Sequence, residues 1–500
     1  MDALAAFLAD CAGFLDEAGL VTDPADRRRF EVDVWRQDEG RAAAVVRPRD
    51  VAEVRRVVAA AFRHRVPLVP QGGNTGLAGG GLPDGSGRMV VLSLERLRRI
   101  RHLDPAGEYL VAEAGCVLAE VQEAAARMDR TFPLDLGAAG SCRIGGNVAT
   151  NAGGIHALRY GTMRRLVLGV EVVLADGSLL DRLHTLDKDN RGYALEQLFV
   201  GSEGTLGVVT AASLRLVPRP RHRLTAWLAV PEAAAVVEVF RRTRDRFGEL
   251  LVACELLSEA AVDLVVGRLG ARRPVAAPCP WHLLLELAWG FDLPLEDAFT
   301  AHLAELMEGG PVADGTLALD EGKRRALWAI RERVSEAAAR AGRVVRSDLA
   351  VPTARVPELL AEAEALVARL LPEARPIPFG HLGDGNIHLN VLVPPERLAE
   401  GHAKLREPLA DLAVRLGGTF SAEHGIGRHK RALLARHARP GELAVMAALA
   451  ALFDPRGILN PGVLLPDGLT PWRAGEHGPE GLSARAGPSP ASGGGDGGRR

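Results

Sequence analysis

Two long segments of small residues constrain the fold of this 500-residue chain more than any other feature. The first, QGGNTGLAGGG at residues 71–81, has six glycines in eleven positions, and the second is GAAGSCRIGGNVATNAGG at residues 137–154. Such segments let backbone N–H groups approach an anion or lie against a flat, extended ligand. A flexible surface turn is the alternative for the first segment, but Asn74 and Thr75 carry side chains that can fix local backbone or reach a phosphate.

Neither segment matches the familiar phosphate-binding loops. No Gly-Lys-Ser/Thr follows the first one, which excludes a Walker A loop, and no G-x-G-x-x-G stands between a strand and a helix. The literal G-x-G-x-x-G at residues 493–498 lies in a glycine-rich tail, where a chance match is expected.

The segment FGHLGDGNIHLNV at residues 379–391 predicts a β-hairpin with its turn at Asp384-Gly385. This register puts His381 opposite His388, with Cβ atoms about 4.5–5.5 Å apart, and puts Asn390 on the same face. Two imidazoles so placed can share one metal ion. Two histidines on a polar face without a metal are the alternative, and a metal site needs a third ligand.

The remaining pattern indicates more than one domain. Residues 2–18 predict an amphipathic helix, and a capping box from Asp50 to Glu53 opens a helix that ends near His64. From residue 221, strand-like runs alternate with alanine-rich helices, which favours an α+β domain with helices on one face of a sheet. A single helix at residues 321–341 places Arg331 and Ser335 on one face, where a solvated charged surface is the alternative.

Composition excludes several classes of function. The 61 basic and 63 acidic residues give a net charge of −2, so nothing favours nucleic acid as a partner. The five cysteines form no C-x-x-C pair, which argues against a disulfide framework and fits a reducing compartment. The N-terminus lacks the basic region of a secretory signal, and no apolar run approaches the ~20 residues of a membrane span. We expect a cytoplasmic protein, with peripheral membrane association left open.

Five motifs together resemble a known flavoprotein family. VPQGGNTGLAGGG, GSCRIGGNVATNAGG and LFVGSEGTLGVVT resemble the FAD-binding domain of the vanillyl-alcohol oxidase and p-cresol methylhydroxylase flavoproteins. FGHLGDGNIHLN and SAEHGIGRHKR resemble, more narrowly, the branch of D-2-hydroxyacid dehydrogenases, and in particular those that act on D-2-hydroxyglutarate. The resemblance spans about residues 30–465 and implies an α+β fold, with a two-part FAD-binding domain and an α+β substrate-binding cap domain.

The expected organisation has five parts. They are an N-terminal helical segment (residues 1–40), the FAD-binding domain (41–220), the cap domain (221–420), a C-terminal segment that returns to the flavin (421–465) and a disordered tail (466–500).

The resemblance implies a set of residues that contact FAD. In the first segment these are Pro70, Gln71, Gly72, Gly73, Asn74, Thr75, Gly76 and Leu77. Elsewhere they are Ser141, Gly145, Gly146, Asn147, Thr150, Asn151, Gly154, Val209 and Asn460. Many relatives attach the flavin through a histidine in the first loop. The corresponding position here is Asn74, and the loop contains neither histidine nor cysteine, so we expect non-covalent FAD.

The resemblance also implies a metal site and a catalytic base. It assigns a divalent metal, zinc or another ion, to His381, His388 and Glu423, and the base to His424. A His/His/Glu set with an open position is typical of catalytic zinc. Substrate contacts fall on Arg331, Ser335, Arg346, Asn390 and His424, with serine and arginine where relatives have threonine and lysine. The implied reaction passes a hydride from the substrate to FAD, and an electron-transfer flavoprotein or a quinone then reoxidises the flavin.

Other functions remain open at this stage. One is a D-lactate or glycolate dehydrogenase of the same fold, in which Arg331 and Arg346 serve another purpose. Others are a flavin electron-transfer or binding module without turnover, and a zinc protein without flavin. The oligomeric state is also open, with a homodimer as one option.

Overall fold

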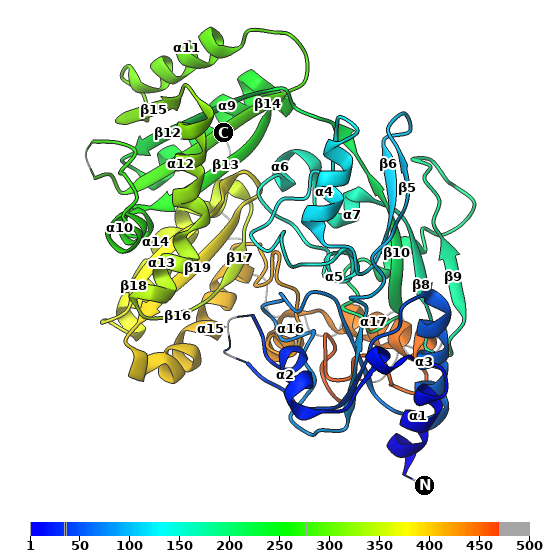
Figure 1. The fold of residues 1–500 in the computed structure, drawn as a ribbon. Coiled ribbons are helices and arrows are strands. Elements are labelled where there is room, and N and C mark those ends of the chain that lie inside the picture. Colours follow the sequence, from blue (N-terminus) through cyan, green and yellow to red (C-terminus); the bar gives the residue numbers. More distant parts are fainter. Residues whose placement is uncertain (1, 35, 37, 277, 470–500) are drawn as a thin grey trace, which may run out of the picture.

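The protein has two lobes joined by a C-terminal segment (Figure 1). The computed structural model describes residues 2–34, 36, 38–276 and 278–469. The structure describes two sheets of four and five strands in the N-terminal lobe, one large sheet in the cap lobe and a separate two-stranded sheet. Most of the expected disordered tail, residues 470–500, lies outside the described residues. None of the described helices is both long and apolar enough to span a membrane.

The first sheet of the N-terminal lobe has the strand order β1-β2-β4-β3. Its strands are β1 (Leu20–Val21), β2 (Ala42–Val46), β4 (Met89–Ser93) and β3 (Leu68–Gln71), with β2, β4 and β3 parallel. Helices α1 (Ala3–Ala12), α2 (Pro24–Glu31) and α3 (Val51–His64) belong to the same part. The Asp50 carboxylate accepts a hydrogen bond from the Glu53 N–H at 2.9 Å, so α3 begins where predicted. The first helix ends at Ala12, earlier than predicted.

The second sheet is antiparallel, with the order β5-β6-β10-β8-β9. The strands are β5 (Ile100–Asp104), β6 (Tyr109–Glu113), β10 (Val208–Arg215), β8 (Val167–Val173) and β9 (Leu179–Arg182). The helices of this part are α4 (Leu118–Ala126), α5 (Ile144–Ala149), α6 (Ala157–Tyr160), α7 (Met163–Leu166) and α8 (Glu196–Phe199), and the short β7 (Arg130–Thr131) pairs with β11 (Val217–Pro218). Helix α5 lies within the second small-residue segment and packs on β10, which brings that segment to the junction of the two sheets.

The cap lobe is built on an eight-stranded antiparallel sheet with the order β15-β12-β14-β13-β18-β19-β16, and with β17 paired to β19. The bounds are β15 (Asp314–Ala318), β12 (His222–Val230), β14 (Trp281–Trp289), β13 (Leu251–Ser258), β18 (Arg375–His381), β19 (Asn386–Val393), β16 (Arg343–Val345) and β17 (Asp348–Ala350).

Helices cover both faces of this sheet, so the prediction of helices on one face is wrong. Along β12, Leu224, Ala226 and Leu228 belong to one core, which includes α9 (Ala233–Phe247), α11 (Glu296–Met307), α14 (Val356–Leu370) and α15 (Leu398–Arg415). Trp227 and Ala229 belong to another core, which includes α10 (Glu259–Leu269), α12 (Glu321–Glu332) and α13 (Val334–Ala341). Because side chains alternate along a strand, a strand that is apolar at every position is buried on both faces.

Two local predictions in the cap lobe need correction. The helix expected over residues 321–341 is interrupted at Arg333, which separates α12 from α13. The hairpin turn is a four-residue loop, because Leu382–Asp384 forms a 3-10 turn and, of Asp384 and Gly385, only Gly385 has a positive φ of 74°. His381 therefore pairs with Asn386, and Phe379 pairs with His388. A shift of two residues keeps both histidines on one face, so they remain diagonal neighbours.

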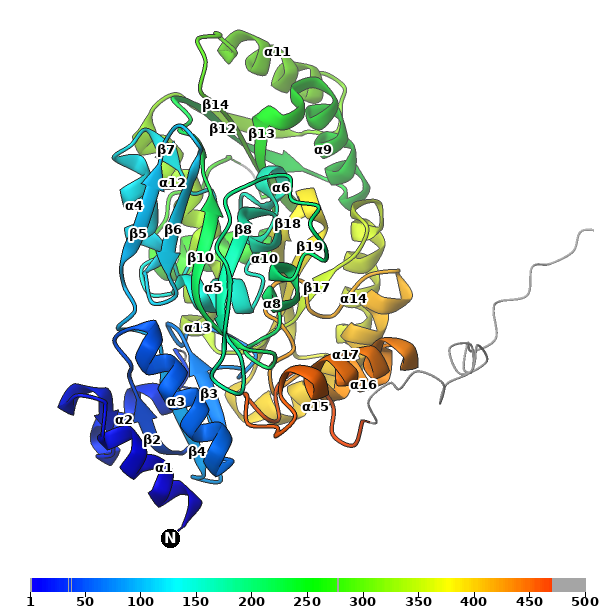
Figure 2. The same ribbon diagram turned by 90° about the vertical axis from the view of Figure 1, so that its right-hand side faces the viewer.

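Residues 458–460 pack against the first sheet. After α16 (Arg431–His437) and α17 (Pro440–Phe453), Leu459 forms a parallel bridge with Leu68 of β3. The Asn460 N–H donates to the Leu68 carbonyl at 2.8 Å, and Ile458 and Leu459 join the core of this part. Before α16, labelled in Figures 1 and 2, Ser421 forms a bridge with Asp348 of β17, and Ile426 and Gly427 donate to Glu203, so residues 421–430 lie between the lobes.

Candidate functional site

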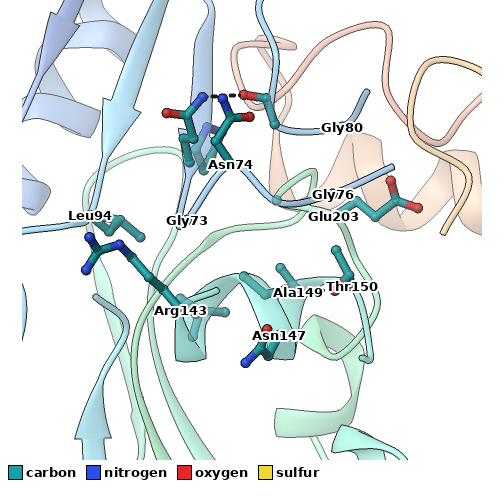
Figure 3. Close-up of a pocket in the computed structure, with 18 of the residues that line it drawn as sticks. Gly73, Asn74, Gly76, Gly80, Leu94, Arg143, Asn147, Ala149, Thr150 and Glu203 are labelled. Carbon is teal, nitrogen blue, oxygen red and sulfur yellow. Dashed lines mark hydrogen bonds between the residues drawn. The ribbon is translucent and has the colours of Figure 1, made fainter. Parts of the chain in front are cut away.

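A pocket lies between the two small-residue segments (Figure 3). The first segment forms one wall and α5 forms the facing wall. The segments touch closely, since a Cβ added at Gly73 would lie 2.2 Å from the Ser141 carbonyl oxygen. Of the residues expected to contact FAD, those that line this pocket are Pro70, Gln71, Gly72, Gly73, Asn74, Thr75, Gly76, Gly145, Gly146, Asn147, Thr150 and Val209.

Side chains hold the first segment in place. Asn74 has a left-handed φ of 54°, and its Nδ2 donates to the Val32 carbonyl at 2.8 Å. Gln71 Nε2 donates to the carbonyls of Phe30 and Gly81 at 2.9 and 2.7 Å. Of the two roles proposed for the Asn74 side chain, the structure therefore supports fixing the backbone rather than reaching a phosphate.

Five predicted cofactor residues do not line this pocket: Leu77, Ser141, Asn151, Gly154 and Asn460. Three of them shape its surroundings. Asn460 Nδ2 donates to the carbonyls of Gly80 and Glu203 at 2.9 and 2.8 Å, and Asn151 Oδ1 accepts from Thr162 Oγ1 at 2.9 Å. A Cβ at Gly154 would lie 1.9 Å from a backbone oxygen, so only glycine fits there. Leu77 lines a neighbouring cleft instead.

Two charged pocket residues were not predicted from the sequence. Arg143 directly precedes Ile144 and the Gly145–Gly146 pair and lines the pocket, and its Nη1 donates to the Gly115 carbonyl at 2.5 Å. The Glu203 carboxylate accepts hydrogen bonds from the N–H groups of Ile426 and Gly427 at 2.8 and 2.7 Å, and burial raises its pKa. Through these two hydrogen bonds, Glu203 holds the loop with Glu423 and His424 next to the pocket.

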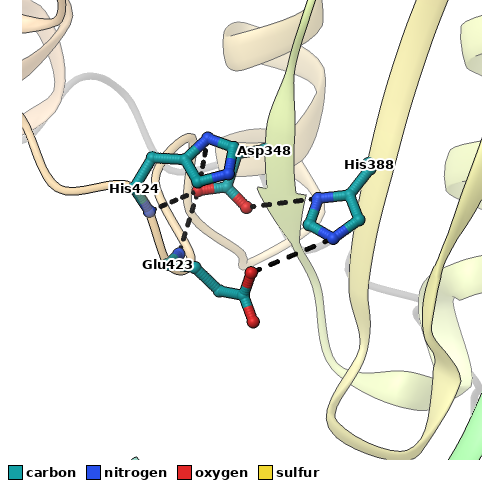
Figure 4. A group of neighbouring side chains, drawn as sticks. All are labelled: Asp348, His388, Glu423 and His424. Atoms are coloured by element: carbon teal, nitrogen blue, oxygen red, sulfur yellow. Dashed lines mark hydrogen bonds and ion pairs between the residues drawn. The ribbon is translucent and has the colours of Figure 1, made fainter. Parts of the chain in front are cut away.

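Two of the expected metal ligands, His381 and His388, each lie close to the third, Glu423. His381 Nε2 lies 3.4 Å from Glu423 Oε1, and His388 Nε2 lies 3.9 Å from Glu423 Oε2. The two imidazole rings are 5.4 Å apart. A second set of donors overlaps this one, since one atom each of Asp348, His388, Glu423 and His424 lies within 4.8 Å of the others (Figure 4). The nitrogen and oxygen donors fit a divalent transition-metal ion.

A buried carboxylate orients His381 from behind. Glu255 on β13 is 1% exposed; its Oε1 lies 2.8 Å from His381 Nδ1, and its Oε2 accepts from Arg331 Nε at 2.7 Å. Burial opposes a charge on His381, but Glu255 and Glu423 outweigh it and raise the pKa of His381 to about 9. A carboxylate behind a ligating histidine is a common support for a bound metal.

Asp348 contacts His388, His424 and the backbone of Glu423. Its Oδ2 accepts from the N–H groups of Glu423 and His424, both at 2.9 Å. Its two oxygens lie 3.8 Å from His388 Nδ1 and 3.6 Å from His424 Nδ1. Burial opposes its charge, but His424 and Lys430 hold the pKa of Asp348 well below its usual range. Asp348 thus fixes a metal-ligand candidate and the expected base, although no sequence motif marks it.

His424 lies between the two lobes. It lines the pocket between the small-residue segments and also the neighbouring cleft of about 710 Å³ between the lobes. Its ring stacks on His388 at a centroid distance of 5.9 Å. Burial lowers the pKa of His424, so a neutral imidazole is favoured at neutral pH.

The expected substrate residues come from several elements of the cap lobe. Arg331 is bound to Glu255 and is 7% exposed, whereas Arg346 lines the neighbouring cleft together with His424. Asn390 lies on β19, two residues after His388 and therefore on the same face. Ser335 lies on α13, beyond the interruption at Arg333.

Comparisons with known proteins agree with this arrangement. Residues 42–182 match the family described as "FAD binding domain", and residues 219–464 match "FAD linked oxidases, C-terminal domain". The chain is 41% identical over 449 residues to the mitochondrial D-2-hydroxyglutarate dehydrogenase of Bos taurus, covering 89% of this chain and 81% of the relative. It is 35% identical over 450 residues to a Schizosaccharomyces pombe protein whose assignment as a mitochondrial D-lactate dehydrogenase is provisional, covering 88% and 85%.

A solved structure supports the fold alone. A p-cresol methylhydroxylase with bound substrate matches with a TM-score of 0.71 at 17% identity, covering 92% of this chain and 95% of the other. The expected vanillyl-alcohol oxidase type of fold is thereby confirmed.

Proposed function

Since the chain belongs to the FAD-linked oxidase family, and to its D-2-hydroxyglutarate dehydrogenase branch, we propose that it oxidises a D-2-hydroxyacid to the 2-oxoacid with FAD as the cofactor. The favoured substrate is D-2-hydroxyglutarate. The observation that carries the proposal is His424, which lines the pocket between the small-residue segments and is bound through its backbone to the same aspartate that supports His388.

The pocket suits a non-covalently bound FAD. Its walls are glycines that leave backbone exposed, and Arg143 offers a guanidinium for the diphosphate. Bound FAD supplies the two-electron acceptor for the hydride. Many relatives attach the flavin at the position that Asn74 occupies here. The Asn74 amide donates a hydrogen bond to the Val32 carbonyl.

We propose that His381, His388 and Glu423 hold a divalent metal, zinc or a similar ion. The supporting observation is that both imidazoles turn Nε2 toward the two oxygens of one carboxylate. A cation at this point supplies Lewis-acid polarisation of the substrate hydroxyl. Glu255 and Asp348 keep the Nδ1 sides of the two histidines occupied, so that Nε2 remains the ligating atom.

His424 is the proposed base. Its Nδ1 faces Asp348, which leaves Nε2 to receive the hydroxyl proton as the hydride leaves the substrate carbon. Asp348 stabilises the imidazolium that this transfer creates. The low pKa of His424 before the reaction keeps the imidazole ready to accept the proton.

Arg331, Ser335, Arg346 and Asn390 are the proposed contacts to the substrate carboxylates. Arg346 is the better candidate for selectivity, because it lines the cleft next to His424, whereas Arg331 is held by Glu255 behind the metal site. A D-lactate or glycolate dehydrogenase is the second candidate. The D-lactate assignment of one relative favours it.

Three further expectations complete the proposal. The reduced flavin passes its electrons to an electron-transfer flavoprotein or a quinone, and two copies of the chain form a homodimer. The protein works in a reducing compartment such as the cytoplasm, because all five cysteines are buried free thiols, although the relatives that we report are named as mitochondrial.

The substrate is tested by steady-state turnover with an artificial electron acceptor. We expect kcat/KM to be highest for D-2-hydroxyglutarate, and D-lactate, glycolate and L-2-hydroxyglutarate to be poor substrates. In Arg346→Ala, the loss of one charged hydrogen bond, about 1.5–3 kcal/mol, predicts a fall of roughly 10–150-fold for the diacid and little change for D-lactate. A preference of the wild type for D-lactate would assign the lactate-type function instead.

A further inference from the structure

Lys430 is a largely buried lysine that the proposed reaction does not use. Its side chain is 17% exposed, and its Nζ lies 3.8 Å from Oδ2 of Asp348, whose side chain is 1% exposed. A buried carboxylate is costly unless a cation faces it, and Lys430 supplies a cation. The same oxygen of Asp348 accepts the backbone N–H groups of Glu423 and His424 (Figure 4), so one atom links the lysine to both residues.

The ammonium also closes the turn at residues 420–425, which carries the proposed metal ligand and the proposed base. Lys430 Nζ donates to the Phe420 carbonyl at 3.2 Å and to Ser421 Oγ at 3.0 Å. The serine hydroxyl in turn donates to the Gly425 carbonyl at 2.6 Å. Through this hydroxyl, the ammonium connects the first residue of the turn to its last one.

Supports from both lobes determine where this turn lies. From the N-terminal lobe, Glu203 accepts the N–H groups of the two residues that follow the turn, at 2.8 and 2.7 Å. From the cap lobe, Asp348 accepts two N–H groups within the turn, and Lys430 contacts both Asp348 and the turn. Removing the ammonium leaves the Glu203 contacts in place, but it takes a partner from a carbonyl, a hydroxyl and a buried carboxylate. The turn should then be displaced while the lobes stay folded.

We propose that Lys430 is a positioning residue, whose ammonium holds Asp348 and the turn so that His424 faces the substrate and Glu423 faces the metal. This inference rests on the proposed function, which assigns the base to His424. Lys430 acts through Asp348 and the turn, and it takes no proton in the reaction. Its positive charge is part of the role, because a neutral side chain cannot balance a buried aspartate.

Chemical rescue of Lys430→Ala tests this role. The substitution leaves space for a small amine, and the cleft that Lys430 lines gives access to it. In FAD-loaded protein with saturating zinc, the limiting rate of flavin reduction by D-2-hydroxyglutarate should fall about 10²-fold, the cost of a displacement of about 1 Å. The substrate concentration that gives half of this rate should change little, because the substrate contacts are retained. Ethylammonium should restore most of the lost rate in a saturable manner.

Two control variants separate the charge from other effects. Lys430→Met fills the site with an apolar side chain, so it should be as slow as Lys430→Ala and should not respond to ethylammonium. Lys404→Ala removes a lysine that is paired with Glu400 and does not line the cleft, so it should reduce its flavin at the wild-type rate. The FAD content, read from the absorption spectrum, should equal that of the wild type in all three variants.

Zinc affinity gives a readout that does not depend on turnover. Because the turn carries Glu423, Lys430→Ala should bind zinc about tenfold more weakly in competition with a chelator, at the low end of the cost of losing a group behind a metal ligand. Ethylammonium should restore the affinity of Lys430→Ala. The same measurement on Lys430→Met corrects for any binding of the amine to zinc.

Two results would overturn the inference. One is Lys430→Ala protein with the flavin-reduction rate and zinc affinity of the wild type, and the other is a slow Lys430→Ala protein that ethylammonium does not restore. Failure of the proposed function gives a different pattern. In that case D-2-hydroxyglutarate does not reduce the flavin of the wild type, whereas zinc affinity still falls in Lys430→Ala and recovers with ethylammonium.

Discussion

Glu255 offers a sharp test of the proposed metal site, because it touches neither the metal position nor the cofactor pocket. One Glu255 oxygen lies 2.8 Å from His381 Nδ1, and the other accepts a hydrogen bond from Arg331 Nε at 2.7 Å. Glu255→Gln keeps the shape of the side chain and removes its charge. We expect a weaker metal site and an unchanged FAD content.

The magnitude follows from the two hydrogen bonds. A hydrogen bond to a charged group contributes about 1.5–3 kcal/mol and a neutral one about 0.5–1.5 kcal/mol, so each bond loses about 1 kcal/mol. Two bonds lose about 2 kcal/mol, which corresponds to roughly 30-fold in affinity at 1.36 kcal/mol per tenfold. This agrees with the 10–100-fold that the loss of a carboxylate behind a metal ligand typically costs.

The assay is a competition between the protein and a chelator for zinc, with FAD content read from the absorption spectrum. Glu286→Gln is the matched control. Glu286 is also 1% exposed in the cap sheet, where it accepts hydrogen bonds from Thr225 Oγ1 and Trp328 Nε1, but it has no contact with His381. Both variants should lower the melting temperature, and only Glu255→Gln should lower zinc affinity. Equal zinc affinities in Glu255→Gln and wild type would refute the reasoning.

Three further outcomes are expected. Acid precipitation should release FAD into the supernatant, because the first segment offers no attachment side chain; yellow colour that stays with the pellet would show a covalent bond. His424→Ala should lower kcat about 10²–10⁴-fold with normal FAD content, and near-normal turnover would exclude it as the base. Chelation should abolish turnover while FAD stays bound, and a divalent ion should restore it; full activity of metal-free protein would remove the metal from the mechanism.

The sequence predicted the elements that depend on local chemistry. The capping box at Asp50 gave the start of helix α3, and the alternation of strand-like runs with helices from residue 221 indicated the α+β cap domain. The two small-residue segments line one pocket, and their glycines let the two backbones approach closely.

The sequence predictions were wrong where the structure depends on the geometry of a turn or on residues that are distant in sequence. Asp384-Gly385 predicted a two-residue turn, but the chain forms a 3-10 turn before Gly385, which moves the register by two residues. The helix at residues 321–341 reads as continuous, yet it is interrupted at Arg333. Neither error changes which residues form the site, because a shift of two residues keeps His381 and His388 on the same face of the sheet.

The supporting carboxylates could not be predicted. Asp348 and Glu255 lie in apolar strands, and each lies far in sequence from the histidine that it orients. Only sheet pairing brings them together, since Asp348 pairs with His388 and Glu255 pairs with His381. A buried charged residue in an apolar strand is the signal that can indicate such a role.

Anaerobic mixing of the FAD-loaded protein with a single D-2-hydroxyacid tests the central claim most directly. With D-2-hydroxyglutarate, the flavin absorbance should disappear in one kinetic phase and yield one 2-oxoglutarate per flavin, and the L-enantiomer should cause no change. If no member of a panel of D- and L-2-hydroxyacids reduces the flavin, the protein is not a 2-hydroxyacid dehydrogenase, and the account of His424 and the metal site is wrong.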